Sequence, residues 1–401
     1  MKNKFQIILG EPVVVARRPE VTEEIGMANW GYYQFPKIEK VDNDRLYLHY
    51  HVDKDKTEAY GADTDHHFLS SDNGQTWTQC KRDEGYINGC QLPDGSYIRK
   101  HMPRPLKATE VELPAEPDAI HTANCNGDTL LPFYAEEHFD AALNEIGTAR
   151  KYPGEEWTVE MKPISIPGGA RCVIDGYFPY RWIEVLRVAP DGRVWGVAYP
   201  PYLDNEYNGK PGTKVTFIVS DDNGQTFHYL SHIPFQPDPD YEEAYAKHQP
   251  PISAFSEADI EFLPNGTIVC VMRSQDFEVE MPCYISYSYD NGETWTKPQI
   301  FDVHGVSPSL LRLKCGVTLA TYGRPGVYLR ATDDPEAKEW QDPITIVEPD
   351  PSGNVVTCSN NTFVALDDHT AIMTYTMFYY PDEKGEPHKT VLCRTITIQE
   401  V

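Results

Sequence analysis

The sequence predicts an all-β fold, a six-bladed β-propeller, and three observations support this prediction. Proline and glycine supply 33 and 27 of the 401 residues, which favours many short strands joined by turns over long helices. One turn pattern, S-x-D-x-G-x-T-[WF], occurs three times along the chain. The intervals between the copies fit sheets of four short strands, which is the size of a propeller blade.

The repeated pattern occupies residues 70–77, 220–227 and 288–295. Its aspartate can accept hydrogen bonds from N–H groups of the same turn, and its Asn-Gly pair suits positive φ angles. The threonine suits the outgoing strand, and the aromatic residue can pack between neighbouring sheets. A degenerate fourth copy covers residues 331–334, with Trp340 behind it.

The spacing of the copies sets the number of blades. Asp222 and Asp290 are 68 residues apart, and Asp290 and Asp333 are 43 apart, so each interval fits one blade. The 150 residues between Asp72 and Asp222 fit two or more. We therefore expect one propeller over residues 1–401, with blades at about 28–80, 84–160, 173–230, 252–298, 304–342 and 355–400. Residues 5–16 are expected to add a strand that closes the last blade, and residues 135–150 to form a short helix or loop insertion.

Charge and composition exclude several classes of partner. A formal net charge of −26 repels phosphate backbones and anionic bilayers, so we expect neither nucleic acid nor membrane as a partner. The N-terminal apolar run is broken at Gly10 and Pro12 and is too short for a secretory signal. Nine cysteines without CxxC spacing predict neither a disulfide framework nor a zinc site, and they favour a reducing cytoplasm. No cofactor is expected.

The repeated turn resembles the Asp-box of the sialidase superfamily, and the resemblance extends over nearly the whole chain. It implies a ligand site at the mouth of the central channel, where the innermost strand of each blade begins. The turns themselves would lie on the outside of the propeller. They indicate the fold and leave the chemistry open.

Two blades carry residues that match the sialidase site. In sialidases a glutamate begins the inner strand of the fourth blade and acts as base toward a tyrosine nucleophile, and an arginine ends the next strand. The resemblance places Glu257 and Arg273 at these positions, with Arg273 in a triad that clamps the substrate carboxylate. In blade five it implies a further clamp arginine, Arg324, with Arg330 as the alternative. The competing interpretation is a surface salt bridge or packing along a strand.

The general acid is expected on the loop before the first repeated turn. Sialidases carry an aspartate there, and this chain has the string Asp63-Thr64-Asp65-His66-His67. Asp65 or Asp63 would take the role, with His66 or His67 as hydrogen-bond partner or substitute. The same string could suggest a metal, but no third set of ligands accompanies it, so no metal site is predicted.

Two departures from the family affect the mechanism. Gln34 stands where sialidases have the first clamp arginine, and Asn360 stands where the nucleophilic tyrosine is expected. Tyr375, Tyr379 and Tyr380 come one strand later. Because an amide cannot form the aryl glycoside intermediate, we expect water to displace the leaving group directly, with Gln34 and Asn360 contacting the substrate.

Aromatic residues before the inner strands could supply a wall for a sugar ring. Trp30, Tyr32 and Tyr33 precede the first inner strand, and a second group precedes the third inner strand: Tyr177, Phe178, Tyr180, Arg181 and Trp182. We expect Trp30 and Tyr177 to contact the substrate. The alternative is ordinary packing between blades.

The sequence therefore predicts a sialidase-like exo-glycoside hydrolase that releases a terminal acidic sugar, sialic-acid-like or uronic, from a carbohydrate substrate. Two alternatives remain open. One is a sugar lyase on the same scaffold, with His66 or His67 as base. The other is a non-catalytic glycan-binding propeller.

Overall fold

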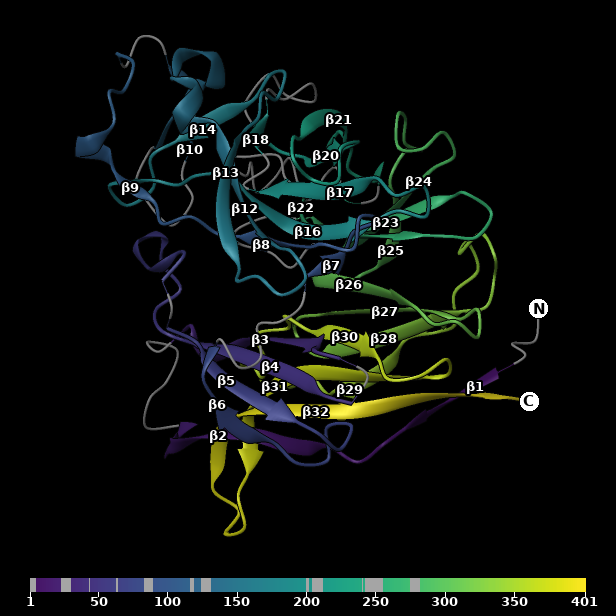
Figure 1. Cartoon of the computed structure of the whole chain (residues 1–401). Helices are drawn as coiled ribbons and strands as arrows, with labels where there is room; N and C mark the ends of the chain where they lie inside the picture. The colour runs from purple at the N-terminus through teal and green to yellow at the C-terminus, as the bar shows by residue number, and fades with distance from the viewer. Residues whose placement is uncertain are drawn as a thin grey trace.

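Six antiparallel sheets are arranged in a ring about a central channel (Figure 1). The computed structural model describes residues 5–22, 30–42, 44–62, 64–82, 89–115, 119–123, 131–199, 202–203, 212–239, 241, 255–274 and 282–401. The inner strands of neighbouring blades contact one another in the order β7, β16, β22, β26, β30 and β3. The predicted all-β class and the six-bladed arrangement are confirmed.

Each blade follows the chain order from the channel outward. Blade I contains β3 (Tyr32–Lys40), β4 (Leu46–Val52), β5 (His66–Ser70) and β6 (Thr78–Cys80). Blade II contains β7 (Cys90–Gln91), β8 (Tyr97–His101), β12 (Glu145–Lys151) and β13 (Thr158–Pro163). Blade III contains β16 (Trp182–Val188), β17 (Val194–Tyr199), β20 (Val215–Ser220) and β21 (His228–Ile233).

The second half of the ring has the same plan. Blade IV contains β22 (Phe255–Phe262), β23 (Ile268–Ser274), β24 (Cys283–Ser288) and β25 (Gln299–Asp302). Blade V contains β26 (Val306–Arg312), β27 (Thr318–Gly323), β28 (Val327–Thr332) and β29 (Ile344–Val347). Blade VI contains β30 (Thr362–Ala365), β31 (Thr370–Pro381) and β32 (Pro387–Glu400), with β1 (Phe5–Leu9) and β2 (Val13–Val21) along its outer edge.

The two ends of the chain meet in blade VI. Phe5 is in register with Glu400 and Leu9 with Ile396, and β2 continues along the same strand from the pair Val13 and Cys393. Strand β1 and the C-terminal end of β32 accordingly lie side by side in Figure 1. The N-terminal strands thus satisfy the backbone groups that the outer edge of β32 would otherwise leave unpaired.

The three repeated turns have one geometry. In the first, the Gly74 N–H donates to Ser70 Oγ (2.9 Å), and the Thr76 N–H and hydroxyl both donate to the Asp72 carboxylate (2.9 and 2.6 Å). The same bonds recur around Asp222 and Asp290. These hydrogen bonds lower the pKa of Asp72 to about 2. Each turn joins the third strand of a blade to the fourth, so it lies at the end of the blade opposite to the start of the inner strand.

The aromatic residue of each turn packs between neighbouring sheets, as its place in the pattern predicts. The Trp295 ring of blade IV stacks on Phe217 of blade III, with the centroids 4.4 Å apart. Phe227 is buried, whereas Trp77 and Trp295 are only partly buried. In the degenerate fourth copy, the aspartate that accepts the turn N–H groups is Asp334 and not Asp333.

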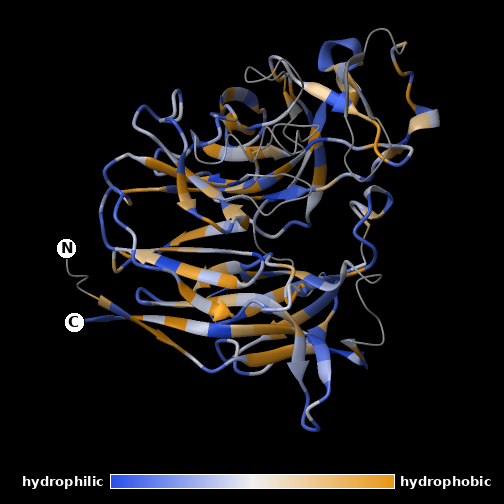
Figure 2. Ribbon diagram, turned by 180° about the vertical axis from the view of Figure 1, so that it is seen from behind, coloured by the Kyte–Doolittle hydropathy of each residue, from blue (hydrophilic) through white to orange (hydrophobic). Residues whose placement is uncertain are grey.

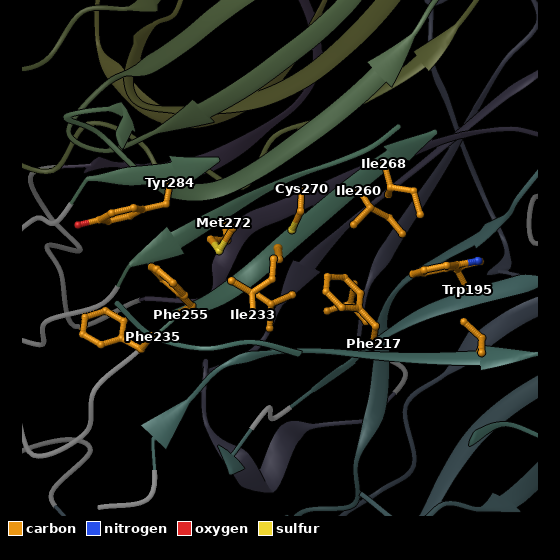
Figure 3. Packing of buried hydrophobic residues seen from close by; sticks show 14 of the residues in the cluster. Trp195, Phe217, Ile233, Phe235, Phe255, Ile260, Ile268, Cys270, Met272 and Tyr284 are labelled. Atoms are coloured by element: carbon orange, nitrogen blue, oxygen red, sulfur yellow. The ribbon is translucent and has the colours of Figure 1, made fainter. Parts of the chain in front are cut away.

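Most apolar contacts lie between adjacent blades. Figure 3 shows Trp195 and Phe217 of blade III facing Phe255, Cys270 and Met272 of blade IV, all fully buried. Burying a side chain of this size contributes roughly 1.5–3 kcal/mol. The strands are largely apolar and many connecting turns hydrophilic (Figure 2). Blade–blade packing therefore holds the inner strands, and the side chains that they carry, in fixed positions.

Two insertions project from blades II and III. The first, between β8 and β12, contains β9 (Leu106–Lys107), β10 (Ala119–Ala123) and β11 (Leu131–Ala135). The second, between β13 and β16, contains β14 (Ala170–Cys172), which pairs with β11, and β15 (Tyr177–Phe178), which pairs with β9. A short hairpin of β18 (Tyr202–Leu203) and β19 (Gly212–Thr213) lies between β17 and β20. Arg181, which precedes β16, forms a buried ion pair with Glu136 of the first insertion and donates to the Ala170 carbonyl of the second, so it joins both insertions to blade III.

The interpretation of residues 135–150 as a helix or loop insertion was wrong in its second half. Residues 136–138 and 141–143 form short 3₁₀ turns, but residues 145–151 form β12, the third strand of blade II. The insertion comes earlier in the chain, and because of its length the third strand of blade II was not recognised in the sequence. No helix in the described part of the chain is long and apolar enough to cross a membrane.

Candidate functional site

The antiparallel order of the blades determines which residues can meet at the channel mouth. The start of each inner strand lies beside the end of the second strand, because the two strands run in opposite directions. Side chains that are far apart in the sequence, such as Glu257 on β22 and Arg273 on β23, therefore reach the same edge. Irregular register at the start of β3, β16, β22 and β26 marks this edge in four blades. Such bulges re-aim side chains and are common beside active sites.

The backbone at this edge is also strained. Six residues other than glycine there have positive φ angles: Tyr33 (54°), Phe35 (53°), Glu257 (42°), Ser307 (46°), Arg324 (55°) and Ser359 (61°). Such angles cost on the order of 1–3 kcal/mol each and cluster at functional sites. The strain points to the same end of the channel as the sequence resemblance.

Two cavities open at this end and share part of their lining. The first, which we call the channel cavity, has a volume of about 430 Å³ and includes Glu257, Ser307 and Asn360 in its lining. The second, which we call the blade I/II cavity, has a volume of about 340 Å³ and includes Asp55, Tyr60 and Trp182. Five residues line both: Lys37, Glu39, Arg99, Lys100 and Glu184. Each volume is in the range of small-molecule sites.

Glu257 is held by two donors at the edge of the channel cavity. Arg273 Nη1 donates to one carboxylate oxygen (2.9 Å), and the Ser307 N–H donates to the other (3.0 Å). Asn360 donates through Nδ2 to Ser307 Oγ (3.1 Å), so its amide also lies at this edge. Glu257 keeps about a quarter of its side-chain surface exposed and is thus both oriented and accessible.

Asp55 is a candidate that sequence reasoning missed. It follows the end of β4, lines the blade I/II cavity and accepts a hydrogen bond from Trp30 Nε1 (3.0 Å). The residue is solvent-exposed, and desolvation by the neighbouring protein raises the pKa of its carboxyl above the usual range. Trp30 lowers the pKa, whereas the negative charge of Glu257 raises it further.

Asp65 has the opposite electrostatic environment. Its two oxygens contact His49 Nδ1 (2.6 Å) and His51 Nδ1 (3.1 Å). Burial acts to raise its pKa, but the two imidazoles outweigh this effect and hold the pKa well below its usual range. Asp65 also lines the blade I/II cavity, as a carboxylate without a proton to donate. Asp63, the other predicted acid, lies outside the described residues.

The two predicted histidines are hydrogen-bonded to tyrosines of their own blade, blade I. His67 is buried and its Nδ1 lies 2.6 Å from the Tyr47 hydroxyl, while His66 Nδ1 lies 3.2 Å from the Tyr50 hydroxyl. Neither histidine is among the residues that line the two cavities. The described side chains between Asp63 and His67 therefore contact different partners.

An aromatic wall stands beside the carboxyl groups. Trp182 packs against Tyr60 and Tyr199, with ring centroids 5.5 and 4.9 Å apart, and its N–H donates to Glu184. Burial and the charge of Asp55 raise the pKa of Tyr60 to about 12. Burial acts to raise the pKa of Glu184, but Lys100 and Lys37 lower it to about 2. Of the two predicted aromatic groups, Trp182 lines the cavity, whereas Tyr177 lies in β15 of the second insertion.

The residues predicted to clamp the substrate carboxylate contact different partners within the protein. Arg273 is bound to Glu257, whereas Arg324 lies 5.2 Å over the Trp30 ring and donates to the Cys358 carbonyl. Gln34 is fully buried, with its side-chain oxygen accepting the Gly31 N–H. The alternative arginine, Arg330, donates to the Phe301 carbonyl.

One group of described residues could approach a metal ion outside the mouth. The ligand atoms of Asp382, Glu386 and His388, on the hairpin between β31 and β32, lie within 4.8 Å of one another. Asp382 Oδ1 already accepts the N–H groups of Lys384 and Glu386, both at 2.8 Å. This pattern is typical of an ordinary hairpin turn, and we assign no metal to it.

Comparison with known proteins places the fold. No protein-family model matches the sequence, and no curated protein matches it significantly. Among solved structures, a protein of unknown function from Dyadobacter fermentans aligns over 98% of this chain and 99% of its own, with a TM-score of 0.63 and 18% identity. The NanB sialidase of Streptococcus pneumoniae aligns over 100% of this chain and 71% of its own, with a TM-score of 0.53 and 13% identity.

A third structure gives the same result. The intramolecular trans-sialidase of Ruminococcus gnavus aligns over 97% of this chain and 98% of its own, with a TM-score of 0.51 and 11% identity. At such low identities the likeness establishes the architecture, and the activity has to be argued from the site. The chain has the sialidase-like six-bladed propeller fold.

Proposed function

We propose that the protein is a glycoside hydrolase in which Asp55 is the general acid and Glu257 the general base. The observation that carries the proposal is the pair of carboxyl groups at the channel mouth in unlike environments. The Asp55 carboxyl is solvent-accessible and its pKa is raised above the usual range, whereas Glu257 receives hydrogen bonds from Arg273 and the Ser307 N–H. Two carboxyl groups with divided roles are the usual machinery of glycoside hydrolysis.

The proposed reaction is a direct displacement by water. Asp55 gives its proton to the glycosidic oxygen as the bond from that oxygen to the anomeric carbon breaks. Glu257 takes a proton from the water that forms the new bond to the same carbon. Asn360 and Ser307, which are hydrogen-bonded to each other beside Glu257, are suited to orient this water or a sugar hydroxyl. The product would have the inverted configuration.

Two of the three tyrosines of β31 contact the apolar core and do not favour a covalent alternative, whereas the third, Tyr379, is exposed. Tyr375 is buried in the apolar core of blades V and VI, and this burial raises its pKa to about 12. Tyr380 packs against the same core. With Asn360 at the position expected for the nucleophile, the chain offers a water-orienting amide there.

We still propose an acidic terminal sugar as the substrate, but fewer arginines are available to bind its carboxylate than the sequence predicted. Arg273 already binds Glu257, so its role would be to position that carboxylate. Arg324 is the remaining candidate for a bidentate contact with a sugar carboxylate. Its place over Trp30, the residue that binds Asp55, puts it beside the acid.

A screen of aryl glycosides of sialic acids, uronic acids and neutral sugars tests the activity. On the best substrate, Asp55→Asn and Glu257→Gln should each lower kcat by roughly 10²–10⁴. The loss for Asp55→Asn should shrink when the aryl group is a good leaving group, because that group needs no proton. Asp53→Asn is the matched control, since Asp53 lies in the same loop but does not line the two cavities.

The screen also separates the remaining alternatives. Full activity in Asp55→Asn would refute the assignment of the acid. An unsaturated sugar product would indicate a lyase. Binding of a sugar without turnover, unchanged by Glu257→Gln, would support the non-catalytic glycan-binding propeller, which the amide at position 360 favours.

A further inference from the structure

We propose that Glu184 binds the hydroxyl group next to the anomeric carbon of the substrate, so that the acidic sugar is a uronic acid and not a sialic acid. In a uronic acid the ring carbon next to the anomeric carbon carries a hydroxyl group, whereas in a sialic acid it is a CH₂ group. The inference rests on the proposed function, which places the anomeric carbon between Asp55 and Glu257.

Glu184 has the same place in blade III that Glu257 has in blade IV. Each is the third residue of an inner strand, β16 or β22. Ile183 and Val185 pair with consecutive residues of β17, so Glu184 between them is the extra residue of a β-bulge. The irregular register of β22 includes Glu257 in the same way. A bulge re-aims the side chain that it carries, and both glutamates line the channel cavity.

Glu184 lies on the wall that the two cavities share. It lines the channel cavity together with Glu257 and the blade I/II cavity together with Asp55. Its side chain keeps 28% of its surface exposed. In the proposed reaction the bond that breaks lies between the acid Asp55 and the base Glu257, so the ring carbon beside the anomeric carbon comes to the shared wall. A substituent on that carbon would therefore meet the Glu184 carboxylate.

The Glu184 carboxylate is ionised and retains acceptor capacity. Burial acts to raise its pKa, but the charges of Lys100 and Lys37 and the hydrogen bond from Trp182 lower it to about 2. Trp182 Nε1 donates to Oε2 (3.2 Å), and Lys37 Nζ lies 3.8 Å from Oε1. An ionised carboxylate has about four lone-pair sites and donates no hydrogen bond, so the group that complements it is a donor. A sugar hydroxyl is such a donor, and a CH₂ group is not.

The neighbours of Glu184 fix the acceptor before a substrate binds. Trp182 packs against Tyr60 and Tyr199, with ring centroids 5.5 and 4.9 Å apart, so the indole that donates to Glu184 is itself held in place. Lys100 Nζ donates to the main-chain carbonyl of Glu184 and thus holds the bulge. A site built to accept a hydrogen bond rejects a ligand without the donor, because the polar group of the site is then left unpaired. The position of Glu184 therefore favours a uronic acid over a sialic acid.

Aryl glycosides that differ only in this hydroxyl group test the inference. The probes are 4-nitrophenyl glucuronides and galacturonides of both anomers, their 2-deoxy analogues and 4-nitrophenyl sialosides. The wild type should hydrolyse a uronide in preference to the sialosides, and the reverse preference would overturn the proposal. Glu184→Gln should lower kcat/KM for the best uronide by roughly 10–100-fold, because a hydrogen bond to a charged group is lost. The same substitution should leave kcat/KM for the 2-deoxy analogue nearly unchanged.

A matched control separates contact with the hydroxyl group from support of the fold. Glu160 also contacts a lysine, Lys162 at 2.6 Å, and keeps 34% of its side-chain surface exposed, but it lies on β13 and does not line the two cavities. Glu160→Gln should therefore leave kcat/KM unchanged for both substrates. Equal losses on the uronide and its 2-deoxy analogue in Glu184→Gln would assign Glu184 a structural role only and would overturn the proposal. Should Glu184→Gln fail to fold by circular dichroism, Glu184→Asp keeps the charge, withdraws the carboxylate by one CH₂ group and should show the same selective loss.

Binding without turnover keeps this inference separable from the proposed function. Thermal unfolding with free glucuronate and galacturonate should show a rise in Tm that the 2-deoxy acids do not give, and Glu184→Gln should lose that difference. Such binding together with full activity in Asp55→Asn would keep the hydroxyl site and reject the hydrolase assignment. Activity that needs Asp55 and Glu257 but falls equally on both substrates in Glu184→Gln would keep the hydrolase and reject the hydroxyl site. Neither uronate binding nor uronide hydrolysis in the wild type would overturn the proposal outright.

Discussion

Replacing Asp65 by Asn should destabilise the protein in a pH-dependent way. The carboxylate makes two short contacts, to His49 Nδ1 at 2.6 Å and to His51 Nδ1 at 3.1 Å, with 23% of its side-chain surface exposed. A hydrogen bond to a charged group contributes about 1.5–3 kcal/mol, and partial exposure reduces this, so we expect a loss on the order of 2 kcal/mol. For 401 residues the entropy of unfolding is about 0.8 kcal/mol/K, and the Tm should fall by about 2–3 °C.

The sign of the pH dependence follows from both partners. The lowered pKa of Asp65 gives stability that is present above the unfolded value of about 3.9 and is lost as the pH falls through the folded value. For His51, burial lowers the pKa but Asp65 more than offsets it, so the pKa is raised. That part of the stability is present below about 6.5 and is lost as the pH rises through the folded value. The difference in Tm between wild type and variant should therefore be largest between about pH 4 and 6.5.

Calorimetry at several pH values measures this difference, and histidine titration by NMR gives its cause. The pKa of His51 should fall in Asp65→Asn, because the imidazolium loses its partner. Asp53→Asn is the control for a change of charge in the same loop. A Tm difference that stays constant from pH 5 to pH 9, or an unchanged titration of His51, would refute the reasoning.

Two further predictions concern packing and the proposed acid. Gly292→Ala should destabilise the fold by several kcal/mol, because its Cβ would lie 2.0 Å from the Trp195 ring, whereas Gly266→Ala, with a similar φ and open space, should cost about 1–2 kcal/mol. Equal losses in urea denaturation would show that φ alone decides both. Trp30→Phe removes a hydrogen bond that lowers the pKa of Asp55, so this pKa should rise. Activity needs the protonated acid and is lost above its pKa, so the alkaline limb of the pH–rate profile should move to higher pH. A shift to lower pH would contradict the role of Asp55.

The architecture could be predicted from the sequence because its signals are local. The aspartate, glycine and threonine of each repeated turn bond to one another within five residues, as around Asp72. Such a turn is specified by the residues that it contains, whatever the rest of the chain does. Three copies at blade-like intervals were enough to indicate the ring of sheets. The strand of residues 145–151 shows the limit of this prediction. A long insertion before that strand interrupts the regular spacing of strands, so the strand was not predicted.

Part of the site also follows from strand order. Glu257 begins one strand and Arg273 ends the next, and an antiparallel pairing brings such residues together. The sequence could not say that Arg273 would be engaged by Glu257. That contact depends on the bulge between Ser256 and Asp259 and on the positive φ of Glu257, which re-aim the carboxylate.

The sequence by itself determined the fold class and the number of blades, and it predicted the edge of the ring where we propose the site. Only the tertiary structure distinguished among the acidic residues of blade I. Asp55 lies in a string of charged residues, DKDK, that is typical of a solvated loop, and Asp65 lies beside two histidines that bind elsewhere. Their pKa values differ because neighbouring protein desolvates the Asp55 carboxyl and the negative charge of Glu257 of blade IV adds to this effect, while Asp65 lies between two imidazoles of β4. Burial and charge depend on neighbours brought together by folding, and no local pattern contains them.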